Sequence, residues 1–257
     1  MHDLFRGSIN MPVSDPYKKI VLITGASGGL GQVLCRAFAT GGYFVGVHVN
    51  RNIHGGEKMV ETLNARGTAA ALFPADLCHS GAVRLMFDDI LEKWGRIDLL
   101  INNAAIIKDR LVARMPQADW DDVIDLNLTG VFFCMREAGR SMTRQGGGHI
   151  MNIASRAALT GRVGQAAYAA SKRGLIALGQ TAAREWGGVP IQVNTILPGF
   201  LNTPMTAGLS REKRAHLSQE NLLSRPATTR EIAEFILDLS KMKHISGQTF
   251  NLDSRIV

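Results

Sequence analysis

The sequence predicts a single α/β domain built around a parallel sheet. Seven short apolar segments alternate with segments whose apolar residues recur at helical spacing, and the first apolar segment leads directly into a glycine-rich turn. The chain of 257 residues fits one large domain better than two small ones, and it is long enough to bury a sizeable core.

The predicted strands are rich in apolar and β-branched residues, as is typical of strands buried on both faces of a parallel sheet. They span residues 19–24, 43–49, 69–74, 97–101, 149–154, 191–197 and 247–252. Helical spacing predicts helices after the glycine-rich turn and over residues 57–66, 80–94, 120–143, 164–186 and 229–240. A polar, helix-like segment over 205–222 is bounded by loop signals, so we expect a movable lid at about 203–224.

Composition and charge narrow the classes of function. Lys and Arg outnumber Asp and Glu by 29 to 22, which favours acidic or phosphate-bearing ligands. The basic residues are spread out, so nucleic-acid binding is not expected. Three widely spaced cysteines, scattered histidines and the lack of a long apolar run indicate a reduced, cytoplasmic protein with no metal site and no membrane span. Residues 1–17 are expected to form an extended arm before the domain at 18–257.

The first strand is followed by a glycine-rich turn that runs from Thr24 to Gly31. Glycines at this place let the backbone approach a pyrophosphate closely, and free N–H groups at the start of the next helix favour the anion. A tight turn without a ligand explains the same glycines about equally well. The βαβ length up to the strand at 43–49 favours the nucleotide-binding interpretation.

Three further segments lie at predicted strand ends where a nucleotide would bind. The second strand ends in Asn50-Arg51, without the acid that accepts a hydrogen bond from the ribose of NAD. Arg51 therefore indicates NADP(H), whose 2′-phosphate an arginine attracts. The alternative interpretation is an exposed loop arginine that binds no cofactor. Asp76 follows the third strand and is expected at the adenine edge. Residues 102–105 follow the fourth strand, where small side chains let a cofactor lie close.

Ser155, Tyr168 and Lys172 are the candidate catalytic residues. Tyr168 and Lys172 are four residues apart and share a helix face, where an ammonium is expected to lower the pKa of the phenol and prepare it to act as an acid. Ser155 follows the strand at 149–154, and its hydroxyl could donate a hydrogen bond to a substrate carbonyl. The alternative for the Tyr and Lys is an exposed pair with no catalytic role.

Asn127 and Gly130 interrupt the apolar face of the predicted helix at 120–143. An asparagine buried in such a face costs free energy unless its amide is hydrogen-bonded. A kink in the helix or a bound water would explain its presence.

These segments together resemble the classical short-chain dehydrogenase/reductase family, from about Lys18 to Asp253. The family's TGxxxGxG turn is matched by Thr24, Gly25, Gly29 and Gly31, its NNAG by residues 102–105 with Ala105 in place of glycine, and its catalytic tetrad by Asn127, Ser155, Tyr168 and Lys172. The resemblance implies a Rossmann-type, doubly wound parallel sheet with helices on both faces. It also implies a nicotinamide cofactor and a homotetramer or dimer packed through the helices at 120–143 and 164–186.

Within that family the chain looks most like the 3-oxoacyl-ACP reductases, through GQAAYAASKRGLI, AARE, PGFLNTPMT and ISGQTFNLD. The resemblance implies that Lys172 binds the nicotinamide ribose and that Asn127 anchors a water in a proton relay. The cofactor-binding residues it implies are Thr24, Gly25, Ser27, Gly28, Gly29, Leu30, Gly31, Asn50, Arg51, Asp76, Leu77, Asn103, Ala104, Ala105, Tyr168, Lys172, Pro198, Gly199 and Thr203.

Two departures from that pattern affect the expected partners. The ending Asp253-Ser254-Arg255 replaces the family's Asp-Gly-Gly type, and Gly146 and Val189 stand where basic residues would face an acyl carrier protein. Arg140 and Arg144 are the candidate substitutes for that contact. The carrier of the substrate, ACP or CoA, therefore stays open.

The leading hypothesis is an NADPH-dependent reduction of a 3-oxoacyl thioester in fatty-acid or polyketide biosynthesis. One alternative is a reductase or dehydrogenase for another secondary alcohol or ketone, such as a sugar, a steroid or an aromatic polyketide. Another is a cofactor-binding subunit without turnover. Since the tyrosine and the glycines are all present, the sequence favours an enzyme.

Overall fold

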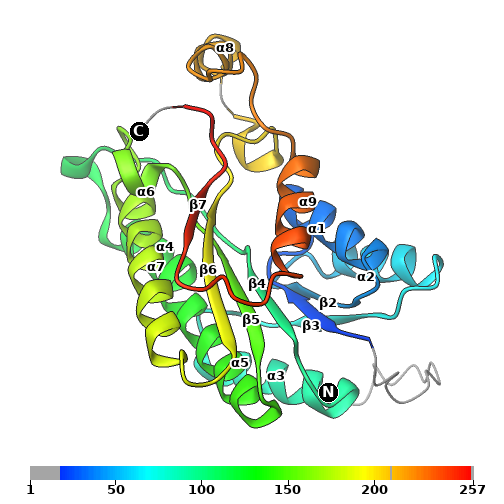
Figure 1. Cartoon of the computed structure of the whole chain (residues 1–257). Coiled ribbons are helices and arrows are strands. Elements are labelled where there is room, and N and C mark those ends of the chain that lie inside the picture. The colour runs from blue at the N-terminus through cyan, green and yellow to red at the C-terminus, as the bar shows by residue number, and fades with distance from the viewer. Residues whose placement is uncertain (1–17, 209, 256–257) are drawn as a thin grey trace.

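A single sheet of seven parallel strands runs through the part of the chain that the structure, a computed structural model, describes: residues 18–208 and 210–255 (Figure 1). The strand order is β3-β2-β1-β4-β5-β6-β7. The strands are β1 Ile20–Ile23, β2 Phe44–Val49, β3 Ala70–Pro74, β4 Leu99–Asn102, β5 Gly148–Ile153, β6 Ile191–Leu197 and β7 Thr249–Asn251. The predicted arm, residues 1–17, lies outside the described residues.

The chain enters the sheet at its centre and leaves it in two directions. From β1 it runs outward through β2 to β3, crosses back to β4 beside β1, and then continues outward to β7. Leu22 of β1 consequently lies in register between Gly46 of β2 and Leu100 of β4. This topology confirms the predicted doubly wound sheet, and it places a topological switch point between the carboxyl ends of β1 and β4, where such sheets bind ligands.

Helices cover both faces of the sheet because alternate side chains of each strand point to opposite sides. Val21 and Ile23 of β1 belong to a core packed with residues of α1, α2 and α9. Ile20 and Leu22 belong to a second core, packed with residues of α3, α5 and α7. The regular helices are α1 Gly29–Thr40, α2 Ile53–Asn64, α3 Ser80–Trp94, α4 Gln117–Ile124, α5 Val131–Gln145, α6 Ala157–Thr160, α7 Ala166–Glu185, α8 Arg211–Gln219 and α9 Thr229–Leu239.

The start of α2 differs from the prediction, which placed this helix at 57–66. The helix begins at Ile53 and includes two glycines, Gly55 and Gly56, that precede the predicted start. Asn52 caps it, because its Oδ1 accepts a hydrogen bond of 3.1 Å from the Gly55 N–H. A Cβ at Gly56 would lie 2.5 Å from Leu72 Cδ1, so this glycine serves close packing of α2 on the sheet.

The predicted helix at 120–143 consists of three parts. A π-helical turn, Asp125–Gly130, joins α4 to α5 and contains Asn127, whose side chain is fully buried. The expected kink therefore takes the form of a wider turn, of the kind that often occurs at functional sites.

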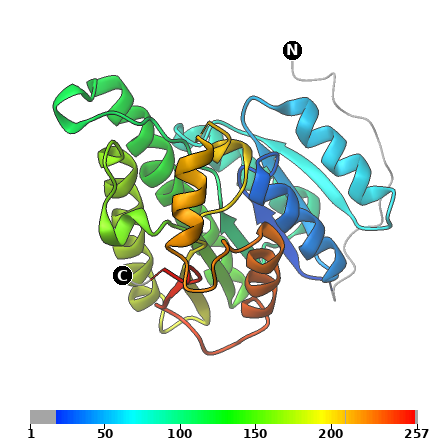
Figure 2. The same ribbon diagram turned by 90° about the horizontal axis from the view of Figure 1, so that it is seen from above.

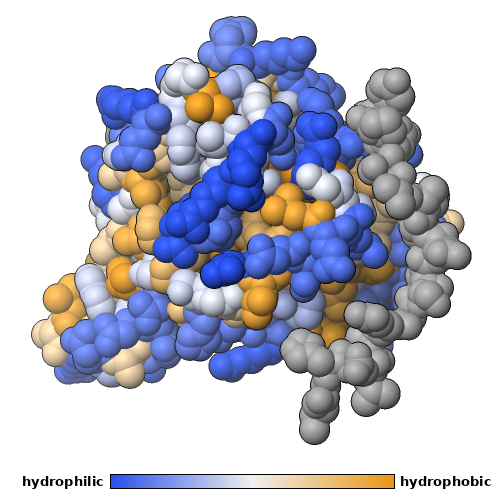
Figure 3. Space-filling model, turned by 90° about the horizontal axis from the view of Figure 1, so that it is seen from below, coloured by the Kyte–Doolittle hydropathy of each residue, from blue (hydrophilic) through white to orange (hydrophobic). Residues whose placement is uncertain are grey.

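The polar segment at 205–222 folds into the short 3₁₀ helix η3, Pro204–Thr206, and the helix α8. Because α8 follows the carboxyl end of β6, it lies over that edge of the sheet, as the view from above shows (Figure 2). The view from the opposite end shows a surface where hydrophilic residues are interspersed with smaller hydrophobic areas (Figure 3). Among the described helices, none is both long enough and apolar enough to span a membrane.

Candidate active site

A cavity of about 640 Å³ lies at the carboxyl edge of the sheet. Its wall is formed by the glycine turn after β1 and by the segments that follow β4, β5 and β6. Residues of the helices α7 and α8 complete it. Most of the predicted site residues line it: Gly25, Ser27, Gly28, Gly29, Leu30, Asn50, Leu77, Asn103, Ala104, Ala105, Ser155, Tyr168, Lys172, Pro198, Gly199 and Thr203. The structure thus brings together residues that are up to 178 positions apart in the chain.

Five predicted residues do not line the cavity: Thr24, Gly31, Arg51, Asp76 and Asn127. Thr24 is buried, and its Oγ1 accepts hydrogen bonds from the backbone N–H groups of Asn103 (2.9 Å) and Ala104 (3.0 Å). It therefore ties the turn after β1 to the turn after β4, on the two sides of the switch point.

The glycine turn packs too closely for side chains. Gly25 has φ +64°, and a Cβ there would lie 2.8 Å from Ala104 Cα. A Cβ at Gly29 would lie 2.8 Å from Thr203 Cβ, and both residues line the cavity. Gly28 precedes α1 as its N-cap, and no side chain of the described residues caps this end. The first N–H groups of α1 consequently face the cavity and suit an anion such as a diphosphate.

His48 of β2 is a cavity residue that sequence reasoning missed. Its Nδ1 accepts a hydrogen bond of 3.1 Å from the Gly25 N–H, and its Nε2 lies 3.1 Å from the Ala75 carbonyl oxygen. Burial lowers the pKa of His48 to about 4, so the ring is neutral near pH 7 and Nε2 carries the proton. His48 thus holds the glycine turn against two neighbouring strands. A histidine inside an apolar run was the available signal.

The loop after β2 only partly matches its predicted role. Asn50 lines the cavity, whereas Arg51 is exposed and lies outside its wall. That Arg51 binds the 2′-phosphate and so selects NADP(H) over NAD(H) therefore stays a prediction. Asp76 also lies outside the wall, because its Oδ1 accepts a hydrogen bond of 3.0 Å from the Cys78 N–H, while the adjacent Leu77 lines the cavity.

Ser155, Tyr168 and Lys172 meet in the cavity wall from β5 and α7. Ser155 lies two residues beyond the end of β5, and its side chain is hydrogen-bonded to Tyr168. Lys172, one turn after Tyr168, has its Nζ 5.9 Å from the centre of the tyrosine ring and donates a hydrogen bond of 2.8 Å to the Ile153 carbonyl. The exposed Tyr–Lys pair, our alternative interpretation, is wrong, because Lys172 is only 1% exposed.

The predicted lowering of the Tyr168 pKa is wrong for this structure. Burial raises the pKa of Tyr168, and it outweighs the hydrogen bond from Ser155, which lowers the pKa; the charge of Asp109 raises it further. Lys172 is itself affected by burial, which lowers its pKa to about 8. The sequence showed that the two side chains share a helix face, but it gave no measure of how deeply both are buried.

Asn127 joins the π-helical turn to the loop after β4. Its Nδ2 donates to the Ile106 carbonyl (2.9 Å) and to Ser171 Oγ (3.3 Å), and its Oδ1 accepts from the Ile106 N–H (2.9 Å). The amide is therefore hydrogen-bonded, as a buried asparagine requires. Ser171 precedes Lys172 on α7, so this network connects the π-helical turn to the helix that carries Tyr168 and Lys172. The water that Asn127 was expected to anchor stays a prediction.

The sequence of the chain also matches a known protein family. Residues 19–214 match the sequence model of the family described as short chain dehydrogenase. The chain belongs to the short chain dehydrogenase family. Membership confirms the predicted family and makes the protein an oxidoreductase.

Several curated members of the family are similar over nearly the whole chain. The 3-oxoacyl-[acyl-carrier-protein] reductase FabG of Staphylococcus aureus is 37% identical over 237 residues, covering 91% of this chain and 96% of the relative. The 3-oxoacyl-[acyl-carrier-protein] reductase of Synechocystis sp. is 36% identical over 239 residues, covering 93% and 97%. A solved dehydrogenase, the gluconate 5-dehydrogenase of Burkholderia cenocepacia J2315 in complex with NADP and tartrate, has a TM-score of 0.88 and 27% identity, covering 92% of this chain and 94% of its own.

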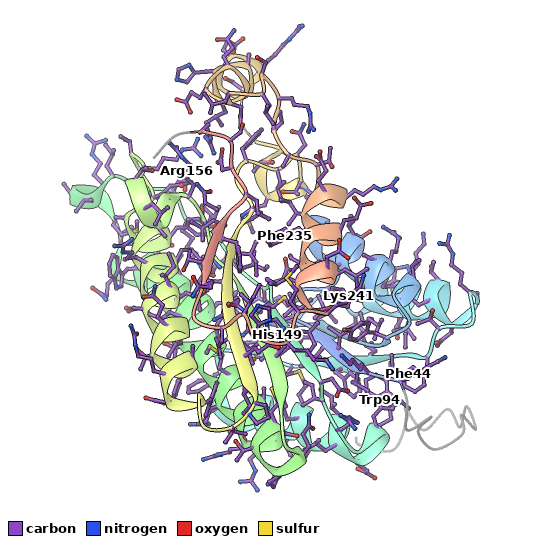
Figure 4. The ribbon with its side chains drawn as sticks, in the orientation of Figure 1. Phe44, Trp94, His149, Arg156, Phe235 and Lys241 are labelled. Atoms are coloured by element: carbon purple, nitrogen blue, oxygen red, sulfur yellow. The ribbon has the colours of Figure 1, made fainter. Side chains whose placement is uncertain are left out.

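The lid side of the cavity contains ionisable residues that sequence reasoning did not name as site residues, although His216 and Glu220 lie in the predicted lid. They are Arg156, Arg162, His216, Glu220 and Arg255. Arg156 directly follows the candidate catalytic residue Ser155 and lies near α6 at the carboxyl edge of the sheet, as Figure 4 shows. Arg255 lies in the ending that departs from the family pattern, and that departure was the only signal in the sequence.

Proposed function

We propose that this short chain dehydrogenase reduces a 3-oxoacyl thioester to the 3-hydroxyacyl thioester with NADPH. The observation that carries the proposal is that Ser155, Tyr168 and Lys172 converge on the cavity that begins at the glycine turn. The similarity to 3-oxoacyl-[acyl-carrier-protein] reductases over more than 90% of the chain supports the thioester as substrate.

The described residues fit a nicotinamide dinucleotide. The glycine turn would hold the diphosphate at the start of α1, where added side chains would collide with Ala104 and Thr203. Asn50 and Leu77 would line the adenosine end, and Lys172 and Gly199 the nicotinamide end. When bound in its reduced form, the cofactor supplies the hydride. An anionic cofactor also suits the excess of basic over acidic residues in the chain.

The protein's own residues then handle the substrate oxygen. Tyr168 would donate its phenolic proton to the oxygen of the ketone as negative charge develops there. Ser155, which is hydrogen-bonded to Tyr168 in this structure, would stabilise the same charge by turning its hydroxyl to donate to the substrate oxygen. An ammonium at Lys172 would favour the phenolate that Tyr168 leaves behind, which compensates for the burial that raises the Tyr168 pKa.

The loss of reduced-nicotinamide absorbance with acetoacetyl-CoA tests this function directly. Turnover with NADPH is the expected result. Tyr168→Phe, which keeps the ring and removes only the proton donor, should lower turnover by about 10²- to 10⁴-fold. NADPH affinity, measured by fluorescence titration, should stay within about twofold. Failure of the native protein to oxidise NADPH with this thioester or with its acyl carrier protein analogue would refute the substrate.

A second candidate function is the oxidation of a hydroxy acid or sugar acid. Arg156 and Arg162 both line the lid side of the cavity, where a carboxylate would find basic side chains. The structural likeness to a gluconate 5-dehydrogenase complexed with tartrate supports this candidate. Formation of reduced nicotinamide from gluconate and NADP⁺, together with inactivity toward the thioester, would favour it over the first proposal.

A further inference from the structure

The C-terminal residues Asp253 to Arg255 lie between the end of β6 and the lid. The Leu252 N–H donates to the Leu197 carbonyl at 2.9 Å, which extends the pairing of the last two strands by one residue. Asp253 then packs on Gly199, where a Cβ would lie 2.9 Å from the Asp253 carboxyl carbon. The segment thus begins on the turn that was predicted to lie beside the nicotinamide.

Arg255 folds back onto Asp253. The Arg255 Nε lies 2.9 and 3.0 Å from the two carboxylate oxygens of Asp253, and the Arg255 N–H donates to Oδ1 at 3.0 Å. The two side chains are only 9% and 1% exposed. Burial alone would raise the pKa of Asp253, but the hydrogen bonds from Arg255 outweigh it and lower that pKa. A buried pair with several parallel contacts holds Arg255 in one orientation.

The same segment reaches the residues that follow α8. While the Arg255 Nε contacts Asp253, its Nη1 lies toward the lid, 3.4 Å from Glu220 Oε2. Ser254 Oγ donates to Asn221 Oδ1 at 3.0 Å, and the Asn221 Nδ2 donates to the Leu217 carbonyl at 2.7 Å. Two adjacent residues of the C-terminal segment therefore bind two adjacent residues at the end of the lid helix.

These contacts lie at the cavity. Arg255, Glu220 and Leu217 all line its wall. The exposed fraction of the Glu220 side chain is 41%, against 1% for Asp253. Since exposed ion pairs are weak, the link from Arg255 to Glu220 is the one that opens most easily, while Arg255 stays on Asp253.

We propose that Arg255 is a positioning residue that holds α8 over the substrate half of the cavity through Glu220, with Ser254 as a second attachment. The name "substrate half" rests on the proposed function, but the attachment itself does not. Breaking it frees α8 without disturbing the glycine turn or the residues around Tyr168. The lid contacts would then affect how tightly substrate is held and leave cofactor binding unchanged.

Limited proteolysis with trypsin tests the attachment without any substrate. Arg211, at the start of α8, is an exposed cleavage site. Glu220→Gln removes the charge that Arg255 contacts, and also the charge that His216 Nε2 contacts at 3.3 Å within α8. Glu220→Gln and Ser254→Ala should each increase the rate of cleavage within the lid about threefold or more, because each weakens one of the two attachments. Gln219→Ala, an exposed change in the last turn of the same helix and next to Glu220, is the matched control and should leave the rate unchanged. Equal cleavage rates in the native protein and both variants would overturn the proposal.

A variant of Arg255 itself tests whether Glu220 acts through it. Arg255→Met should increase cleavage at least as much as Glu220→Gln, and the double variant should cleave no faster than Arg255→Met. Independent, multiplying effects would contradict the proposal. If Arg255→Met fails to fold because Asp253 loses its partner, Glu220→Gln and Ser254→Ala still decide the question, since both leave that pair intact.

Kinetic constants separate positioning from a general loss of structure. In Glu220→Gln the KM for acetoacetyl-CoA should rise about threefold or more, while kcat and the Kd for NADPH stay within about twofold. A change in NADPH affinity as large as that in KM would refute the positioning role. Faster proteolysis together with inactivity of the native protein toward every thioester would refute the proposed function and leave the attachment standing.

Discussion

Lys172→Met gives the most direct test of how the active site is built. Lys172 is 1% exposed, and burial lowers its pKa from 10.5 to about 8. The folded protein thus holds a proton on this amine less readily than the unfolded chain does. At about 1.4 kcal/mol for each tenfold change in the acid constant, keeping the amine charged costs about 3 kcal/mol of folding free energy near pH 7.

The sign of this cost fixes its pH dependence. Because the folded pKa lies below the unfolded one, the cost is fully present below about pH 8 and disappears as the pH rises through 10.5. The native protein should therefore gain about 2 kcal/mol relative to Lys172→Met between about pH 7 and about pH 9.5. Methionine has a similar length and no charge, so the variant lacks this dependence.

The absolute difference near pH 7 is smaller. The variant avoids the cost of the charge but loses the hydrogen bond of 2.8 Å to the Ile153 carbonyl, and a charge-assisted bond of this kind contributes about 1.5 to 3 kcal/mol. We therefore expect the inactive variant to be as stable as the native protein near pH 7, or up to about 2 kcal/mol more stable.

Urea unfolding followed by tryptophan fluorescence, at a series of pH values and fixed protein concentration, measures both quantities. Cofactor binding should also weaken in the variant, because Lys172 lines the predicted nicotinamide end of the cavity. A stability difference that does not change with pH would refute the lowered pKa. A variant less stable by more than about 3 kcal/mol near pH 7 would show that Lys172 stabilises the fold instead.

Three further predictions concern two buried histidines, Ser155 and the loop after β2. Burial lowers the pKa of His48 and of His149 to about 4, below the ordinary 6.5. Neither histidine therefore changes the free energy of unfolding with pH above about pH 6.5. As the pH falls to about 4, each should lower the free energy of unfolding by up to about 3 kcal/mol, because the folded protein keeps the ring neutral while the unfolded chain protonates it. Urea unfolding that is equally favourable at about pH 7 and about pH 5 would contradict this. Ser155→Ala should lower kcat by about 10²- to 10³-fold with little change in KM, and a KM effect alone would exclude stabilisation of the developing charge. Asn50→Asp combined with Arg51→Ala should change the preferred cofactor from NADPH to NADH, by one to two powers of ten in kcat/KM, and an unchanged preference would mean that the cofactor is chosen elsewhere.

The fold was predictable because its signals are local and repeated. Most strands are rich in apolar and β-branched residues, and the predicted strand 191–197 begins and ends where β6 does. The errors arose where a tertiary contact overrides local preference. The predicted start of α2 excluded its two glycines, yet Gly56 lies in the helix and is small because a larger residue would collide with Leu72. No short-range pattern records that contact.

The candidate site was predictable to the extent that its residues belong to motifs. The glycine turn, Ser155, Tyr168 and Lys172 could be named because the spacing of each reflects the strand or helix that carries it. His48 could not, because its role depends on a pairing of β1 with β2 that places its ring against Gly25. The pKa of Tyr168 was predicted with the wrong sign for the same reason, since burial is a property of the whole fold.

The two halves of the cavity differ in what holds them, and this difference accounts for what the sequence could reveal. The glycine turn is fixed because His48 Nδ1 accepts a hydrogen bond from the Gly25 N–H and Thr24 Oγ1 accepts one from the Asn103 N–H. Its glycines have to stay small because added side chains would collide with their neighbours. The lid is held by Arg255 and Ser254, through side-chain contacts at a partly exposed edge. Such contacts can change without disturbing the sheet. Related chains can therefore share the half of the cavity that would hold the cofactor and still accept different substrates. Substitutions in the lid, rather than the shared motifs, are what will distinguish one substrate from another.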